Sequence, residues 1–247
     1  MKKLHTTRRA IATAALGLLL GSPAAMADTF VQTYELPGVQ NTTATFTGGT
    51  GVETFESVDL GFGGFVSNFG GGPYTGTYSY GARIDNANQY GSAGGTGKHA
   101  VTFSDEGYSI TLNKKVSYFG YWLSALDRGN VVEFYEDGDL VGSLTPTNVI
   151  AAIGSNPAYF GNPNAAFAGQ NKGEPYAFVN FYNTDGVFNK IVFREKPMVG
   201  GYESDNHTVG IYKDIGGIPA VPEPSTYGLM LAGLAGVAAI ARRRRNG

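Results

Sequence analysis

The sequence predicts an all-β fold, an antiparallel β-sandwich that is jelly-roll-like. Short segments rich in β-branched and aromatic residues recur along the chain, and Gly, Asn and Asp residues separate them. Hardly any segment has the 3.6-residue periodicity of an amphipathic helix. The 37 glycines, 15 tyrosines and 15 phenylalanines suit tight turns between strands that bury aromatic rings, which is typical of a sandwich.

The expected strands can be placed in chain order from their alternation and β-propensity. They are residues 29–36, 41–46, 101–103, 108–112, 116–123, 131–135, 140–144, 178–182, 188–194 and 208–212. The turn at 136–139 contains Asp-Gly, which favours a tight hairpin between its flanking strands. The turns at 104–107 and 183–186 predict two further hairpins, and residues 147–153 predict one or two turns of helix.

Two stretches break this pattern. Residues 61–97 are rich in Gly, Ser, Asn and aromatics, which indicates either a platform that stacks sugar rings or an irregular loop with edge strands. The stacking candidates are Tyr74, Tyr78, Tyr80 and the single tryptophan, Trp122, for which a core position on a central strand is the alternative. Residues 155–175 contain Pro, Asn and Gly and predict an extended surface loop.

The N-terminal residues 1–27 have the pattern of a secretory signal peptide. Four basic residues precede an apolar run at 10–21, and Ala25-Met26-Ala27 supplies small residues before a cleavage site at Asp28. The adjacent Arg8 and Arg9 also suit a twin-arginine signal, although an ordinary Sec signal explains them without a cofactor. We therefore expect the Sec translocon and signal peptidase as partners.

The tail at 221–247 has three parts in a fixed order. Pro222, Glu223 and Pro224 come first, an uncharged run at 227–241 follows, and Arg242, Arg243, Arg244 and Arg245 form a basic cluster after it. As a helix the run is roughly 22 Å long, slightly short of a full membrane span. Snorkelling arginines compensate for this, so we expect a transmembrane helix whose basic end stays in the cytoplasm.

This three-part tail resembles the PEP-CTERM sorting signal of Gram-negative bacteria that make extracellular polysaccharide. The resemblance implies an exosortase partner, a membrane-embedded cysteine transpeptidase-like enzyme that recognises and cuts near Pro222-Glu223-Pro224. The tail would then hold the protein at the inner membrane transiently, before it reaches the cell surface or the extracellular space. An ordinary anchor helix with a basic stop is the alternative.

The remaining residues, 28–220, are long enough for one extracytoplasmic domain with its own core. Setting aside four basic residues at each end and Glu223 leaves 10 basic and 19 acidic residues. This acidic balance argues against nucleic acid as a partner and is compatible with polysaccharide or divalent cations. The absence of cysteine excludes thiol catalysis and cysteine-based zinc sites.

Glu203, Asp205 and Asn206 form the candidate metal site. Their side-chain oxygens suit Ca²⁺, and segments of the form Glu-Ser-Asp-Asn-His resemble those of other ectodomains with this sorting tail. The alternative is that Asp205 and Asn206 cap a turn through bonds to nearby backbone. Otherwise we expect no cofactor.

Catalytic motifs are absent from the sequence, which contains no G-x-S-x-G, H-E-x-x-H or P-loop. We therefore expect no catalytic residue and no enzyme activity. The sequence favours an exported, exosortase-processed surface or matrix protein associated with exopolysaccharide or biofilm. A carbohydrate-binding sandwich module and a secreted glycan hydrolase are the alternatives.

Overall fold

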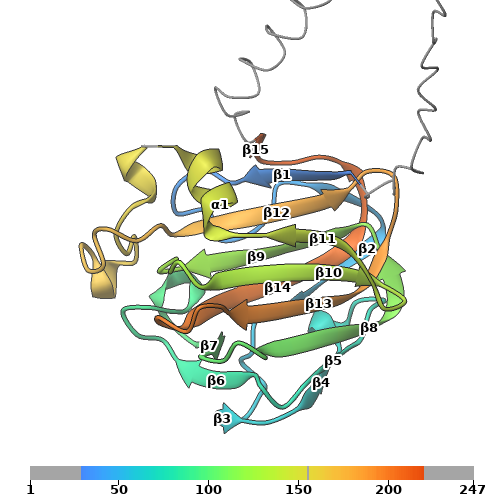
Figure 1. The fold of residues 1–247 in the computed structure, drawn as a ribbon, viewed down its shortest axis with the longest axis horizontal. Coiled ribbons are helices and arrows are strands. Elements are labelled where there is room, and N and C mark those ends of the chain that lie inside the picture. The colour runs from blue at the N-terminus through green and yellow to red at the C-terminus, as the bar shows by residue number, and fades with distance from the viewer. Residues whose placement is uncertain (1–28, 155, 220–247) are drawn as a thin grey trace, which may run out of the picture.

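The computed structural model describes residues 29–154 and 156–219, which fold into two antiparallel β-sheets that face each other (Figure 1). The larger sheet has nine strands, in the order β15, β1, β12, β9, β14, β7, β6 and β3, with β2 also paired to β14. Its strands are β1 Phe30–Tyr34, β2 Thr45–Glu53, β3 Gly61–Phe62, β6 Arg83–Asn86, β7 Lys98–Thr102, β9 Tyr118–Ser124, β12 Ala177–Asn183, β14 Tyr202–Asp214 and β15 Ile218–Pro219.

The smaller sheet has six strands, in the order β11, β10, β13, β8, β5 and β4. Its strands are β4 Phe65–Ser67, β5 Gly76–Tyr78, β8 Tyr108–Val116, β10 Asn130–Glu136, β11 Asp139–Leu144 and β13 Phe188–Glu195. Short 3₁₀ turns lie at Phe69–Gly71, Ala93–Gly95, Pro157–Tyr159 and Ala165–Phe167. The predominantly β, two-sheet prediction is confirmed for the described residues, and the jelly-roll label stays a prediction.

Aromatic rings from both sheets form the core between them. Phe119 of β9 lies 6.2 Å from Phe134 of β10 and 6.0 Å from Phe193 of β13, measured between ring centroids. All three rings are at most 1% exposed. Burying aromatic area of this kind is the main stabilising contribution that a sandwich core offers.

A second, smaller apolar cluster lies on the opposite face of the larger sheet. Trp122 of β9 and Phe178 of β12 are opposite each other in register, and they pack with Ala125 and Tyr176. Ala93, from the connection between β6 and β7, packs against this cluster. Every residue of β9 and β12 is therefore buried, because connecting segments cover the face that would otherwise meet solvent.

One of the three predicted hairpins is confirmed. β10 pairs with β11 across Asp137 and Gly138, which both have positive φ, as the Asp-Gly turn requires. The other two predictions were wrong, because residues 104–107 join β7 to β8 and residues 184–187 join β12 to β13, and each pair lies in different sheets. These turns cross from one sheet to the other.

The helix α1 Pro146–Ile153 confirms the short helix that the sequence predicts at residues 147–153. The Asn148 side chain accepts a hydrogen bond of 2.9 Å from the backbone N–H of Thr145, the N-cap residue. Pro146 occupies the first turn, where its missing N–H costs nothing. Val149 and Ile153 are buried, so the helix is held by its apolar face.

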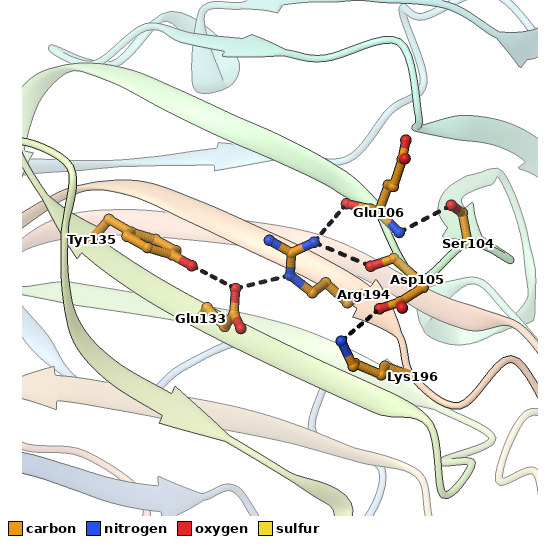
Figure 2. Close-up of polar contacts among 7 residues, drawn as sticks. All are labelled: Ser104, Asp105, Glu106, Glu133, Tyr135, Arg194 and Lys196. Carbon is orange, nitrogen blue, oxygen red and sulfur yellow. Dashed lines mark hydrogen bonds and ion pairs between the residues drawn. The ribbon is translucent and has the colours of Figure 1, made fainter.

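The outer face of the smaller sheet carries a network centred on Arg194 of β13 (Figure 2). Arg194 Nε donates to Glu133 Oε2 at 2.9 Å, and the Tyr135 hydroxyl donates to the same oxygen at 2.7 Å. The Nη1 atom of Arg194 donates to the carbonyls of Asp105 and Glu106, each at 3.1 Å. One guanidinium thus connects β13, β10 and the crossing between β7 and β8.

Candidate functional site

The structure buries three of the four predicted stacking residues. Trp122, Tyr74 and Tyr78 are 0%, 5% and 1% exposed, so their ring faces are not accessible to a glycan. Trp122 faces the second apolar cluster, and Tyr78 and Tyr74 belong to the core between the sheets. Tyr80 alone is open to solvent, at 72% exposure. The prediction that Trp122, Tyr74 and Tyr78 stack on sugars is therefore corrected, because all three side chains are part of the packing. For Trp122 this is the core alternative.

Tyr80 belongs to a row of exposed rings that we call the aromatic strip. It consists of Tyr80, Phe62, Phe103 and Tyr90, which are the exposed aromatic side chains among the described residues. Tyr80 stacks on Phe62 with ring centroids 6.4 Å apart. Arg83 lies between Phe62 and Phe103, with its guanidinium carbon 5.8 Å and 4.5 Å from the two ring centroids. The strip runs across β3, β6 and the end of β7.

Strand register explains why these side chains share a face. Phe62 is opposite Arg83, Arg83 is opposite Val101, and Val101 is opposite Glu203 of β14. Directly opposed residues in an antiparallel pair point to the same side of the sheet. Phe103 follows Val101 by two residues and shares its side. The row lies on the face that points away from the core.

One end of the strip borders a cleft of about 520 Å³, which we call the acidic cleft. Phe103, Tyr90 and Arg83 line it on the side of the strip. Asp85, which is paired with Arg83, also lines it, and three further carboxyl groups line the remainder, those of Asp127, Glu174 and Glu203. They come from the connection after β9, the segment before β12, and β14, so the cleft joins parts of the chain that are distant in sequence.

Glu203 is the most deeply buried of these acids, at 7% exposure. Within the described residues its carboxylate has no cationic partner and no side-chain hydrogen bond, and only its own backbone N–H assists it. Burial raises the pKa of Glu203 to about 8, and the charges of Asp127, Glu195 and Glu174 raise it further. The floor of the cleft thus holds a carboxyl group that keeps its proton at neutral pH.

Asp127 and Glu174 also have raised pKa values, for the same reason of burial. Burial raises the pKa of Asp127, against a hydrogen bond from the Gly201 backbone. Burial also raises the pKa of Glu174, and the charge of Asp127 adds to that shift. One oxygen of Glu174, Oε2, is buried without a hydrogen-bond partner. Asp85, by contrast, is neutralised by Arg83, whose Nε donates to it at 3.0 Å.

Two glycines allow this close packing. A Cβ added to Gly201 would lie 2.9 Å from the Phe103 ring and would also collide with the Glu203 carboxylate. A Cβ on Gly200 would collide with the Asp127 carboxylate. The Gly200-Gly201 pair thus lets both acids and the aromatic wall approach the backbone.

The predicted metal ligands do not act together in this structure. Asp205 Oδ2 accepts the Ala93 N–H at 2.7 Å, and Oδ1 accepts the Asn206 N–H at 2.6 Å. The Asn206 side chain donates to the Gln40 carbonyl at 3.0 Å. Asp205 and Asn206 therefore fix a bulge and a loop, as the capping alternative proposes. In residues 29–154 and 156–219, no three acidic or histidine side chains are grouped so that they would hold a metal ion.

The sequence offered little sign of the acidic cleft. Phe62 and Tyr90 lie in the 61–97 stretch that indicates a stacking platform, but the sequence gives no such sign for Phe103 and Glu174, and it predicts a different role for Glu203. The signal that was available is the position of Arg83 and Phe103 among aromatics and Gly, which does not by itself reveal which strands are neighbours.

The predicted sorting residues and the predicted signal peptide at 1–27 lie outside the described residues. These sorting residues are Pro222, Glu223, Pro224, Arg242, Arg243, Arg244 and Arg245. Among the helices that are described, none combines the length and apolar character needed to cross a membrane.

Comparison with known proteins identifies the tail. A family model described as the PEP-CTERM protein-sorting motif matches residues 220–245, a range that includes all the predicted sorting residues. No curated protein and no solved structure matches the chain. The chain thus carries the PEP-CTERM protein-sorting motif, which supports a PEP-CTERM protein sorted by an exosortase and exported to the cell envelope.

Proposed function

We propose that this protein is an exported, exosortase-processed surface protein whose sandwich binds extracellular polysaccharide without catalysing a reaction. The sorting motif at 220–245 supports export. The aromatic strip supports polysaccharide as the ligand, and it is the observation on which this proposal depends. We further propose that the tail leaves the inner membrane after processing, so that the protein acts at the cell surface or in the matrix of a biofilm.

The strip has the properties that a sugar chain requires. A pyranose ring presents an apolar C–H face, which gains free energy by covering an aromatic ring. Phe62 and Tyr80 are 56% and 72% exposed and lie almost parallel, with 21° between their planes. Large exposed rings that are contiguous are uncommon on monomers and mark binding surfaces. The strip is an open row, which suits a polymer better than an enclosed small molecule.

The test measures retardation of the full-length protein, purified in detergent, in native gels that contain polysaccharide from a producing strain. We expect the wild-type protein to be retarded, and Phe62→Ala and Tyr80→Ala to lose most of that retardation. Leu140→Ala is the matched control, because Leu140 is 56% exposed and lies on β11 of the smaller sheet. Equal retardation of all four proteins, or none of the wild type, would contradict the proposal.

A secreted glycan hydrolase is the second candidate, and the acidic cleft is the observation that favours it. Glycosidases use a pair of carboxyl groups, one of which has a raised pKa. Release of reducing ends from the polysaccharide by the wild type, and its loss in Glu203→Gln, would establish this candidate in place of the non-catalytic one.

A further inference from the structure

The acidic cleft contains three carboxyl groups, those of Asp127, Glu174 and Glu203, that form no ion pair with a cation of the described residues, although the charge of Arg128 acts on Asp127. Arg83 lines the same cleft but is paired with Asp85 through its Nε at 3.0 Å. The remaining groups that act on Glu203 are Asp127, Glu195 and Glu174, which are all acidic. Burying like charges together is unfavourable, so Glu203 keeps its proton while the cleft is empty and can ionise when a partner of opposite charge joins the group. The site is therefore suited to a cationic ligand.

Glu203 shows where that ligand would be bound. Its side chain is 7% exposed, lines the cleft and lacks a cationic partner among the described residues. Glu174, which also lines the cleft, has one buried oxygen, Oε2, without a hydrogen-bond partner in the described part of the chain. Buried polar groups normally have partners, so unpaired groups of this kind on one wall indicate an occupant with hydrogen-bond donors.

The walls of the cleft distinguish between kinds of cation. A bare divalent ion needs several converging oxygens and little space, whereas this cleft measures about 520 Å³. Phe103 and Tyr90, 42% and 43% exposed, form part of its lining. Aromatic rings beside carboxylates fit a ligand with both an apolar face and an ammonium group.

We propose that the acidic cleft binds the protonated amine of an amino sugar, as one unit of the polysaccharide that follows the aromatic strip. This inference rests on the proposed polysaccharide binding, and it names the chemical class of the sugar. The Glu203 and Glu174 carboxylates accept hydrogen bonds from the ammonium, and Phe103 covers the sugar ring. Glu203 gives up its proton to solvent when the ammonium arrives, so binding releases a proton and forms no covalent bond.

The test compares two hexasaccharides by isothermal titration calorimetry with the full-length protein in detergent. One is β-1,4-linked glucosamine with free amines, and the other is its N-acetylated counterpart of the same length. At about pH 6, where primary amines are protonated, we expect the free-amine hexamer to bind about tenfold more tightly or better. Repeating the titration in two buffers of different ionisation enthalpy measures the proton that is released.

The variants assign that preference to the cleft. Glu203→Gln and Glu174→Gln keep the size of the side chain and should bind both hexamers equally, without proton release. Asp139→Asn is the control, because it removes one exposed acid from β11 and should leave the preference unchanged. A preference that persists in both glutamine variants would overturn the inference.

Other outcomes separate this inference from the proposed polysaccharide binding. If both hexamers bind equally and Tyr80→Ala weakens both, the strip binds glycans and the amine inference fails. If the preference for amines persists in Tyr80→Ala, the cleft acts without the strip. Equal affinity for a hexalysine peptide would reassign the cleft to cationic peptides, and proton release on adding CaCl₂ alone that Glu203→Gln abolishes would reassign it to a metal. Absence of binding by either hexamer would overturn the amine inference, and retardation by the polysaccharide of a producing strain would then decide the proposed function separately.

Discussion

The imidazole of His207 lies parallel to the ring of Phe193, with centroids 5.1 Å apart and 2° between the ring planes. This histidine is fully buried between the sheets, where both its nitrogens are paired. Nδ1 is 3.0 Å from the Tyr78 hydroxyl, and Nε2 is 3.0 Å from the Ser204 hydroxyl. Ser204 continues the chain to the Tyr108 hydroxyl at 2.9 Å. A linear polar network thus crosses an aromatic core.

Breaking this network should destabilise the fold. His207→Ala leaves the Tyr78 hydroxyl unpaired, removes one of the two partners of the Ser204 hydroxyl and opens a cavity among the rings, so we expect a loss of about 3 kcal/mol or more in the free energy of unfolding. Tyr78→Phe removes a single hydroxyl and should cost about 1–2 kcal/mol. Urea denaturation of the full-length protein measures both. Losses below about 0.5 kcal/mol would mean that the network contributes little.

Acid should destabilise the protein through its two buried histidines. Burial lowers the pKa of His207 from 6.5 to about 3 and that of His99 to about 4. Between these pKa values the histidines bind protons in the unfolded chain but not in the folded chain. Protonation therefore favours unfolding, and stability is lost as pH falls from 6.5 towards 3. Thermal melting temperatures should fall most clearly from pH 4.5 to 3, below the range in which the Glu203 carboxyl group acts in the opposite direction. A melting temperature that stays constant between the two values would contradict the assignment.

The acidic cleft should make the protein less stable as the pH rises, because its buried carboxyl group Glu203 must lose a proton. Glu203 has a folded pKa of about 8 against 4.5 in the unfolded chain, so folding binds a proton and stability decreases as pH rises from 4.5 to 8. Glu203→Gln removes this penalty, which is of the order of a few kcal/mol. We expect the variant to melt at a higher temperature than the wild type at the alkaline end of this range. Near its acid end the two proteins should melt alike, and a variant that is less stable at both ends would show that the carboxyl group is structural.

Arg194 should not be replaceable by lysine. Lysine keeps the charge near Glu133 but has no planar group that reaches both the carboxylate and the carbonyls of Asp105 and Glu106 (Figure 2). We expect Arg194→Lys to cost about 1 kcal/mol. Amide hydrogen exchange at 104–107 should accelerate. Lys196→Ala is the comparison, because the Lys196 side chain is 67% exposed and its 3.4 Å ion pair with Asp105 should contribute little. Equal effects of the two variants would contradict this account.

The sequence predicted individual elements better than their neighbours in space. The hairpin at Asp137-Gly138 is predicted correctly, because Asp-Gly favours the positive φ angles that a tight hairpin turn requires. The turns at 104–107 and 183–186 have similar residues but connect different sheets, and local turn chemistry does not determine where the chain goes next. Trp122 and Tyr78 were plausible stacking residues by composition, and only the packing of both sheet faces shows that they are buried. The acidic cleft depends on β7, β14 and β9 lying side by side, which no local pattern encodes.

The position of β14 has a consequence for the order of assembly. This strand lies inside the larger sheet, between β9 on one side and β7 and β2 on the other, yet it is the last long strand of the described chain. A polypeptide that crosses a membrane with its N-terminus leading presents β7 and β9 well before the segment that joins them. Until residues 202–214 emerge, β9 and β7 have no strand between them to pair with. The aromatic rings of the core then remain exposed to solvent. For a chain exported in this way, completion of the larger sheet would depend on completion of transport, and an arrested chain would expose its apolar interior.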